Sequence, residues 1–318
     1  MITPTSGTRR LHGRSRIADR LFRGGSRAGA LSVVGLLVAL AAVLAAMSAQ
    51  AFGRFGIVDF VTGTTWDPVR DVYGALPYII GTLASAALAL VIASPIAILT
   101  AVYLSELAPR RVAIPLTFLI ELIAAVPSVV IGLWGVFVLS PFLKATVETW
   151  LVGAFGHIPL FEGPPLGIGL FTAGVILAIM ILPTIVSVSR EVIAAVPATQ
   201  REAMYALGAT RWEVVTRAVL PSARAGIAGA VILGLGRALG ETMAVTMVIG
   251  NAQAIPTSLF SQAQTIASKI ATTFNEASIG LQTSSLIALG LVLLVMTVVL
   301  NAVARLLVWR TSGPGGGS

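Results

Sequence analysis

The chain has 318 residues, of which 56% are hydrophobic and 11% are charged, and its mean hydropathy is +0.94. Soluble domains carry about a quarter charged residues, so this composition excludes a soluble enzyme, a disulfide-built module and a single-span receptor. The formal net charge is +8, and the absence of cysteine excludes disulfides, thiolate catalysis and cysteine-based zinc or iron–sulfur sites. The sequence therefore predicts an all-α integral membrane protein.

Long charge-poor stretches predict six membrane spans, since a helix needs only about 20 apolar residues to cross a bilayer. The third and fifth spans are expected to extend across embedded charges. We expect transmembrane helices at about 30–52, 77–105, 112–141, 166–189, 222–250 and 281–309.

The chain divides into three parts on this basis. Residues 1–29 are expected to form a basic cytoplasmic segment, residues 30–310 the six-span domain, and residues 311–318 a flexible tail. With both termini inside, the inside segments carry 16 basic residues and the outside segments carry four. The positive-inside rule therefore predicts both termini in the cytoplasm. The basic residues are spread over four inside segments, which indicates attraction to lipid headgroups rather than nucleic-acid binding.

The loop between the fourth and fifth spans, residues 197–221, predicts two short helices. Thr199 and Glu202, and again Thr210 and Glu213, have the spacing of a capping box at a helix start. Gly208 suits the left-handed cap between the two helices.

The same loop has two interpretations. Its apolar faces and arginines are compatible with an amphipathic hairpin on the membrane surface, or with a docking element for a cytosolic partner. Pro221 can open the next span. The expected faces are Ala203, Met204 and Leu207 on the first helix and Trp212, Val215 and Val219 on the second.

The spacing of six residues in this loop resembles the EAA loop of bacterial ABC-importer permeases. Met204 at the second alanine and Ala218 at the usual isoleucine are departures that keep the face apolar. The resemblance implies a coupling helix that sits in a groove of an ATP-hydrolysing subunit, and a type I ABC-importer permease architecture. The matching residues are Glu202, Ala203, Met204, Gly208, Leu220 and Pro221.

The chain itself is not expected to be an enzyme or to bind a cofactor. Its two lysines, Lys144 and Lys269, do not follow the glycine that a Walker A motif requires. ATP and magnesium are therefore expected to be used by a separate ATPase subunit. His12 and His157 have no ligands at metal-binding spacing, so no metal site is predicted.

Arg237 and Glu241 are expected about 20 Å and 26 Å along the fifth span, deep in the bilayer. Four residues apart on one helix, they share a face and can pair. They form either a buried ion pair that sets packing or part of a translocation path. Glu121, about 14 Å into the third span, is either a polar partner for a neighbouring span or for backbone freed near Pro127, or a path-lining residue.

The segment around Arg237, GLGRALGETMAVTMVIGN, closely resembles phosphate-specific ABC permease subunits of the PstC type. The similarity extends to ALPYIIGTL at 75–83 and ELIAAVPSVVIGLWG at 121–135. It implies that Arg237 and Glu241 take part in phosphate passage. It also implies a multi-pass protein of the bacterial inner membrane, with a second related permease subunit, two ATPase subunits and an extracytoplasmic phosphate-binding protein as partners.

The sequence leaves alternatives open for both the transported cargo and the energy source of transport. Arginine binds tetrahedral oxyanions through a planar fork, which favours an anion but admits sulfate or molybdate as well as phosphate. Our hypothesis for Glu241 is that its carboxylate accepts a hydrogen bond from protonated phosphate, which sulfate cannot donate. A gradient-driven anion carrier and a sensor of phosphate status are the other classes, and the EAA spacing disfavours the carrier.

Overall fold

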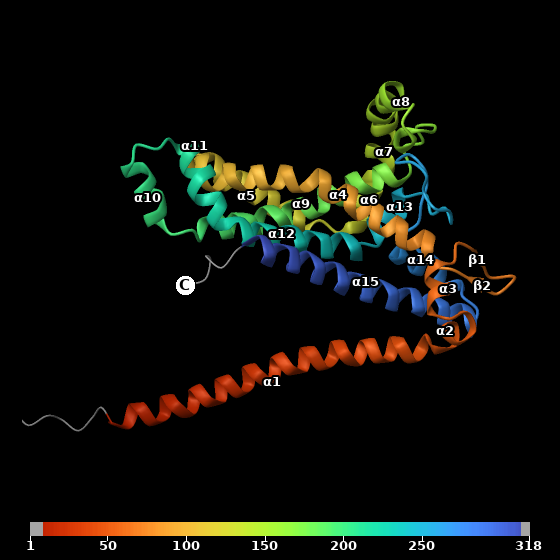
Figure 1. Ribbon diagram of the computed structural model, residues 1–318, viewed down its shortest axis with the longest axis horizontal. Coiled ribbons are helices and arrows are strands. Elements are labelled where there is room, and N and C mark those ends of the chain that lie inside the picture. Colours follow the sequence, from red (N-terminus) through yellow and green to blue (C-terminus); the bar gives the residue numbers. More distant parts are fainter. Residues whose placement is uncertain (1–8, 313–318) are drawn as a thin grey trace, which may run out of the picture.

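The computed structural model describes residues 9–312 and the side chains of residues 21–310. The predicted basic segment and the predicted tail therefore lie partly outside the described residues. The fold is almost entirely helical, and its long helices run roughly along one direction (Figure 1). The long helices and the helices packed among them are α1 (Arg9–Met47), α4 (Leu76–Val102), α5 (Arg110–Ala125), α6 (Ser128–Trp134), α9 (Leu170–Ala194), α12 (Leu220–Gly240) and α15 (Leu281–Ser312).

Short elements connect these helices. The short α-helices are α2 (Ala49–Phe55), α3 (Ile57–Thr62), α7 (Ser140–Leu143), α8 (Thr149–Phe155), α10 (Ala198–Ala206), α11 (Arg211–Val214), α13 (Met243–Val248) and α14 (Ile266–Thr273). The π-helical turns are η1 (Tyr103–Leu107), η2 (Gly135–Leu139), η3 (Lys144–Glu148) and η5 (Val215–Val219), and the 3₁₀ turns are η4 (Pro159–Phe161) and η6 (Phe274–Glu276). Strands β1 (Trp66–Asp67) and β2 (Val72–Tyr73) pair antiparallel, with Trp66 opposite Tyr73.

The prediction of six spans is confirmed within the described residues. Six helical stretches are long and apolar enough to cross a membrane. Because nearly all backbone groups in the middle of a helix bond within it, such segments satisfy the requirement that the bilayer imposes. The stretches are Leu21–Met47, Leu76–Leu107, Ser128–Phe155, Leu170–Ala194, Arg211–Gly240 and Leu281–Arg310.

The expected third helix, 112–141, is wrong as one continuous element. Helix α5 ends at Ala125, and the backbone is extended at Val126 and Pro127 before α6 begins. Proline cannot donate a backbone hydrogen bond and disfavours helical geometry in the residue before it, which explains the break. The helical path then continues to Phe155, well past the expected end.

The expected fifth helix, 222–250, is wrong at both ends. Helical structure begins at Arg211 and runs through η5 into α12, so Pro221 lies inside a continuous helical stretch rather than opening the span. Helix α12 ends at Gly240, the backbone is extended at Glu241, and α13 follows. Glycine is a weak helix former, and the Glu241 carboxylate accepts the amide of Ala244 at 3.4 Å, which helps to restart the helix.

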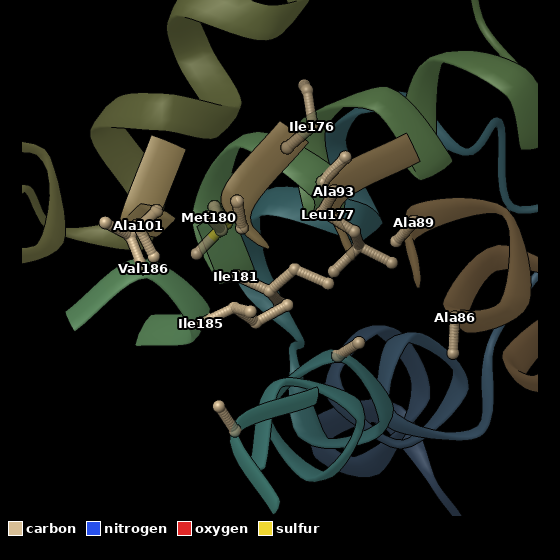
Figure 2. Packing of buried hydrophobic residues seen from close by; sticks show 14 of the residues in the cluster. Ala86, Ala89, Ala93, Ala101, Ile176, Leu177, Met180, Ile181, Ile185 and Val186 are labelled. Atoms are coloured by element: carbon tan, nitrogen blue, oxygen red, sulfur yellow. The ribbon is translucent and has the colours of Figure 1, made fainter. Parts of the chain in front are cut away.

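The core of the bundle is built around α9, which packs between α4 and α12. Helix α4 presents a stripe of fully buried alanines at helical spacing, and α9 presents larger aliphatic residues (Figure 2). Small residues let helices approach closely in a membrane, where packing rather than water drives association. The alanines are Ala86, Ala89, Ala93, Ala97 and Ala101, and the aliphatic residues include Ile176, Leu177, Ile181 and Ile185.

The described ends of the chain lie toward the same end of the molecule as the α10–α11 hairpin (Figure 1). Strands β1 and β2 lie at the opposite end, beside α2, α3 and α14. Most of α1 diverges from the bundle, and its described side chains are nearly all exposed. One end of the bundle therefore carries the hairpin, and the other carries the strands and short helices.

Candidate functional site

Arg237 lies in the last turn of α12 and is half-buried. Its Nη1 donates a hydrogen bond of 2.9 Å to Oγ1 of Thr184 on the neighbouring helix α9. No carboxylate among the described residues lies within ion-pair distance of the guanidinium. The arginine is thus held by a neutral partner and keeps donors for an anion, since a guanidinium has five N–H groups.

Glu241 does not share a helix face with Arg237, because α12 ends between them. The expected pairing is absent among the interactions of the described residues, and Glu241 instead accepts the Ala244 amide at 3.4 Å. Both side chains are half-buried at the same helix break. The break places an arginine and a glutamate beside irregular backbone, which membrane proteins tolerate where it is buried or lines a cavity.

Glu121 is exposed on α5 and lines a groove of about 360 Å³. The groove also contains Arg190 of α9 and Thr117 of α5. No hydrogen bond or ion pair among the described residues joins Glu121 to Arg237 or Glu241. The structure therefore does not bring the three predicted path residues together, and it places Glu121 beside an arginine that the sequence did not single out.

The hairpin of α10 and α11 follows the sequence prediction in part. The Thr210 hydroxyl accepts the Glu213 amide at 3.4 Å, and the Glu213 carboxylate accepts the Thr210 amide at 2.9 Å, which confirms the second capping box. Gly208 has a φ of 80° and confirms the left-handed cap. The first box is wrong, because α10 starts directly after Pro197 and Thr199 lies inside the helix without a capping bond.

The six EAA-loop residues lie in different environments. Met204 packs against the core and Leu220 is half-buried, whereas the other four are exposed. The predicted apolar faces are split in the same way: Val215 and Val219 are buried, but Leu207 and Trp212 are exposed to 84% and 64%. The exposed members are therefore available to a partner. The four exposed EAA-loop residues are Glu202, Ala203, Gly208 and Pro221.

Arg201 is a residue that the sequence analysis missed. Its Nη2 lies 2.7 Å from Oε1 of Glu106 in η1, and its Nε donates to Oε2 at 3.4 Å. It also donates to the carbonyls of Ile193 and Val196, at 2.9 and 2.5 Å, at the end of α9. One side chain thus joins α10 to the ends of two spans. No spacing rule links residues 106 and 201, so the sequence carried no signal for this contact.

The fold and these contacts agree with the family of known proteins to which this chain is similar. Residues 93–313 match the family described as binding-protein-dependent transport system inner membrane component. The chain belongs to this family. It is therefore a multi-pass inner-membrane transport subunit rather than an enzyme.

Individual relatives and a solved structure are similar to this chain over nearly its whole length. Phosphate transport system permease proteins PstC of Mesorhizobium japonicum and Pasteurella multocida are each 48% identical over 92% of this chain, covering 91% and 92% of their own lengths. PstC 2 of Mycobacterium tuberculosis is 41% identical over 92% of this chain and 92% of its own length. A bacterial alginate ABC transporter bound to its periplasmic protein aligns over 94% of this chain and 98% of its own, at a TM-score of 0.60 and 17% identity, which supports the fold.

Proposed function

We propose that this chain is the membrane-spanning permease subunit of an ATP-driven importer that carries inorganic phosphate into the bacterial cytoplasm. The observation that carries the proposal is the 48% identity, over nearly the whole chain, to proteins named as phosphate transport permeases. Membership of a binding-protein-dependent transport family disfavours a gradient-driven carrier. Sulfate and molybdate are the alternative cargoes that an uptake assay must test.

Arg237 is proposed as the residue that binds the anion within the path. A guanidinium presents parallel N–H donors that match two oxygens of a tetrahedral oxyanion. The bond to Thr184 holds the side chain through one N–H group, which leaves the other N–H groups of the guanidinium for an anion. An anion can then replace solvent around the guanidinium without first breaking an ion pair.

Glu241 is proposed as the residue that tells phosphate from sulfate. Its carboxylate can accept a hydrogen bond from a protonated phosphate oxygen, whereas sulfate at neutral pH has no proton to donate and is repelled. Glu241→Gln should then reduce discrimination between the two anions more than it reduces the rate. If selectivity stays intact and assembly falls, Glu241 serves only to cap α13.

The α10–α11 hairpin is proposed as the element that docks on an ATPase subunit, which would bind ATP and magnesium. Tyr205, Leu207 and Trp212 are exposed to 48%, 84% and 64%, an apolar surface suited to a protein groove. Arg201 would transmit movement of the docked hairpin to α4 and α9 through Glu106 and the carbonyls at the end of α9.

The remaining partners are proposed from the surfaces that the isolated chain leaves uncovered. Helix α5 has no buried residue, and α1 diverges from the bundle, which suits contact with a second related permease subunit and with membrane lipid. The excess of basic residues at the hairpin end supports the proposal that this end and both termini face the cytoplasm. The end with the strands would then face an extracytoplasmic phosphate-binding protein, and two ATPase subunits complete the assembly.

Reconstitution tests the proposal directly. The permease is assembled with its candidate partners in liposomes, and uptake of labelled phosphate is measured with and without ATP and with excess sulfate. We expect uptake that needs ATP, survives collapse of ion gradients and resists sulfate. Uptake that persists without ATP would support a carrier, and uptake that sulfate abolishes would change the cargo.

A further inference from the structure

Arg190 lies near the end of α9, away from Arg237, and shares the groove described above with Glu121. Its Nη1 donates a hydrogen bond to Oγ1 of Thr117 on α5. The Thr117 hydroxyl in turn donates to the carbonyl of Ala113 at 2.7 Å, which leaves its lone pairs to accept from the arginine. Side chains on a helix lean toward its N-terminus, so Arg190 leans from the helix end toward the apolar middle of the span.

The charge of Arg190 is not compensated by an acidic residue. No carboxylate among the described residues lies within ion-pair distance of its guanidinium, although Arg201 at the same end of the bundle is paired with Glu106. A half-buried cation with a single neutral partner is unfavourable in an apolar setting unless something else satisfies it. Its remaining N–H donors are therefore available to an anion.

Arg190 opens onto the groove of about 360 Å³ between α5 and α9. Thr117 and Glu121 supply the other polar groups of the lining, and Leu104, Ile114 and Phe118 supply apolar walls. Ile114 and Phe118 are exposed to 69% and 63% in the isolated chain, so the groove is open on this side, and its electrostatic contacts strengthen where lipid or a partner subunit covers these walls. The groove thus combines a cation, a hydroxyl and a carboxylate in an apolar frame.

This combination repeats the one around Arg237. There, an arginine on α12 donates to a threonine of α9 while an unpaired glutamate lies at the same helix break. Here, an arginine on α9 donates to a threonine of α5, and an unpaired glutamate lines the same groove. Thr184 and Arg190 are six residues apart on α9, or about 9 Å along its axis toward the hairpin end.

We propose that Arg190, Thr117 and Glu121 form a second phosphate-oxyanion subsite, nearer the α10–α11 hairpin than Arg237. The guanidinium donates to two oxygens of the tetrahedral group, Thr117 holds the guanidinium in place, and the Glu121 carboxylate accepts a hydrogen bond from the protonated oxygen. The inference rests on the proposed function. Free phosphate leaving the path and the phosphomonoester headgroup of phosphatidic acid share this chemistry, and the test tells them apart.

The test uses the whole reconstituted complex in phosphatidylcholine liposomes. Arg190→Gln removes the charge and keeps a donor for Thr117, Arg190→Lys keeps the charge, and Arg111→Gln removes an exposed charge at the same end as the control. We expect Arg190→Gln to lower ATP-dependent phosphate uptake about 10-fold to 100-fold, the effect of losing charge-assisted hydrogen bonds, with ATP hydrolysis retained. Arg190→Lys should recover part of the uptake, and Arg111→Gln should match the native chain.

Repeating the assay with phosphatidic acid in the liposomes identifies the source of the oxyanion, because its phosphomonoester carries the proton that the diester of phosphatidylcholine lacks. An uptake defect of Arg190→Gln that is equal in both lipids supports free phosphate. If the native chain needs the anionic lipid for uptake, and the defect of Arg190→Gln is seen only in its presence, a headgroup is supported. Native uptake by Arg190→Gln in both lipids would overturn the subsite. A native chain that takes up no phosphate would instead overturn the proposed function.

Thr117→Val keeps the test decisive if Arg190→Gln does not assemble. This variant is close in shape and releases the guanidinium from its anchor. The subsite predicts a raised KM for phosphate with little change in assembly. An unchanged KM together with unchanged uptake would contradict it.

Discussion

Arg201 and Glu106, on α10 and η1, form a two-point ion pair whose side chains are only 20% and 13% exposed. The same guanidinium caps the carbonyls of Ile193 and Val196 at the end of α9. Helix C-termini carry partial negative charge, so the arginine is stabilised by the helix end as well as by the carboxylate. The pair therefore fixes the hairpin to two spans at once.

The first prediction concerns this pair. Removing one partner leaves the other charge half-buried and unpaired. For a well-buried pair this lowers the free energy of unfolding by about 3–5 kcal/mol, and we expect a smaller loss here because both side chains are partly exposed. Arg201→Met and Glu106→Leu should each lower the ratio of phosphate transported to ATP hydrolysed. The double variant should be less impaired than the sum of the two, with a coupling energy of about 1 kcal/mol or more in thermal unfolding. Strictly additive losses would show that the two residues act independently.

The second prediction separates the two threonines of the hairpin. Thr210→Ala removes a capping box and should destabilise α11 by about 1 kcal/mol. Thr199→Ala is the matched control, because Thr199 lies inside α10 without a capping bond and alanine is the better helix former there. Hydrogen exchange should quicken over 211–219 in the first variant alone. Equal effects of the two substitutions would contradict the observed start of α10.

The third prediction concerns a close backbone approach. A Cβ atom at position 81 of α4 would lie 2.3 Å from the carbonyl oxygen of Gln264. Gly81→Ala should therefore destabilise the protein by about 1–3 kcal/mol, as overpacking does. A Cβ at position 229 of α12 meets nothing within 4 Å, so Gly229→Ala should be neutral or stabilising, by about 0.5–1 kcal/mol in a helix. Thermal unfolding in detergent compares the two, and a stable Gly81→Ala would contradict the contact.

The fourth prediction concerns Lys269 of α14, which is 3% exposed. Its Nζ lies 5.0 Å from the ring centroid of Trp66 and 5.5 Å from that of Tyr78, and burial lowers the pKa of Lys269 from 10.5 to about 8. Between pH 8 and 10.5 the unfolded chain then binds more protons than the folded one, so folding stability rises with pH in that window. The cost of the buried charge is fully present below pH 8.

Lys269→Met lacks this titration and isolates its effect. The melting temperature of the variant minus that of the native chain should be largest near pH 7 and should shrink as the pH rises above 8. Unfolding scans at several pH values measure the difference. A difference independent of pH would mean that the cation–π contacts keep the lysine charged throughout.

Apolar length predicted the number of spans, but local backbone chemistry decided where they break. Pro127 was visible in the sequence, yet a proline inside a span is often tolerated, as Pro95 in α4 and Pro183 in α9 are. The break after Gly240 is accompanied by a hydrogen bond from the Ala244 amide to the Glu241 carboxylate, which no periodicity reveals.

The candidate site was predictable residue by residue but not as an arrangement. Thr199 and Thr210 have the same spacing to a glutamate, and only the second caps, because Pro197 already starts the first helix. The partners of Arg237 and Arg201 come from helices distant in sequence, and such contacts depend on tertiary packing. Arg237 itself could be singled out, since an arginine within an apolar span is a functional candidate by default.

In the proposed mechanism, Arg237 binds the transported phosphate. The most direct measurement is ATP-dependent uptake of labelled phosphate by the reconstituted complex carrying Arg237→Gln, with Gly229→Ala on the same helix as the control. We expect uptake to be lost in Arg237→Gln while the complex still assembles and hydrolyses ATP, and we expect the control to match the native chain. Native uptake by an assembled Arg237→Gln complex would contradict it.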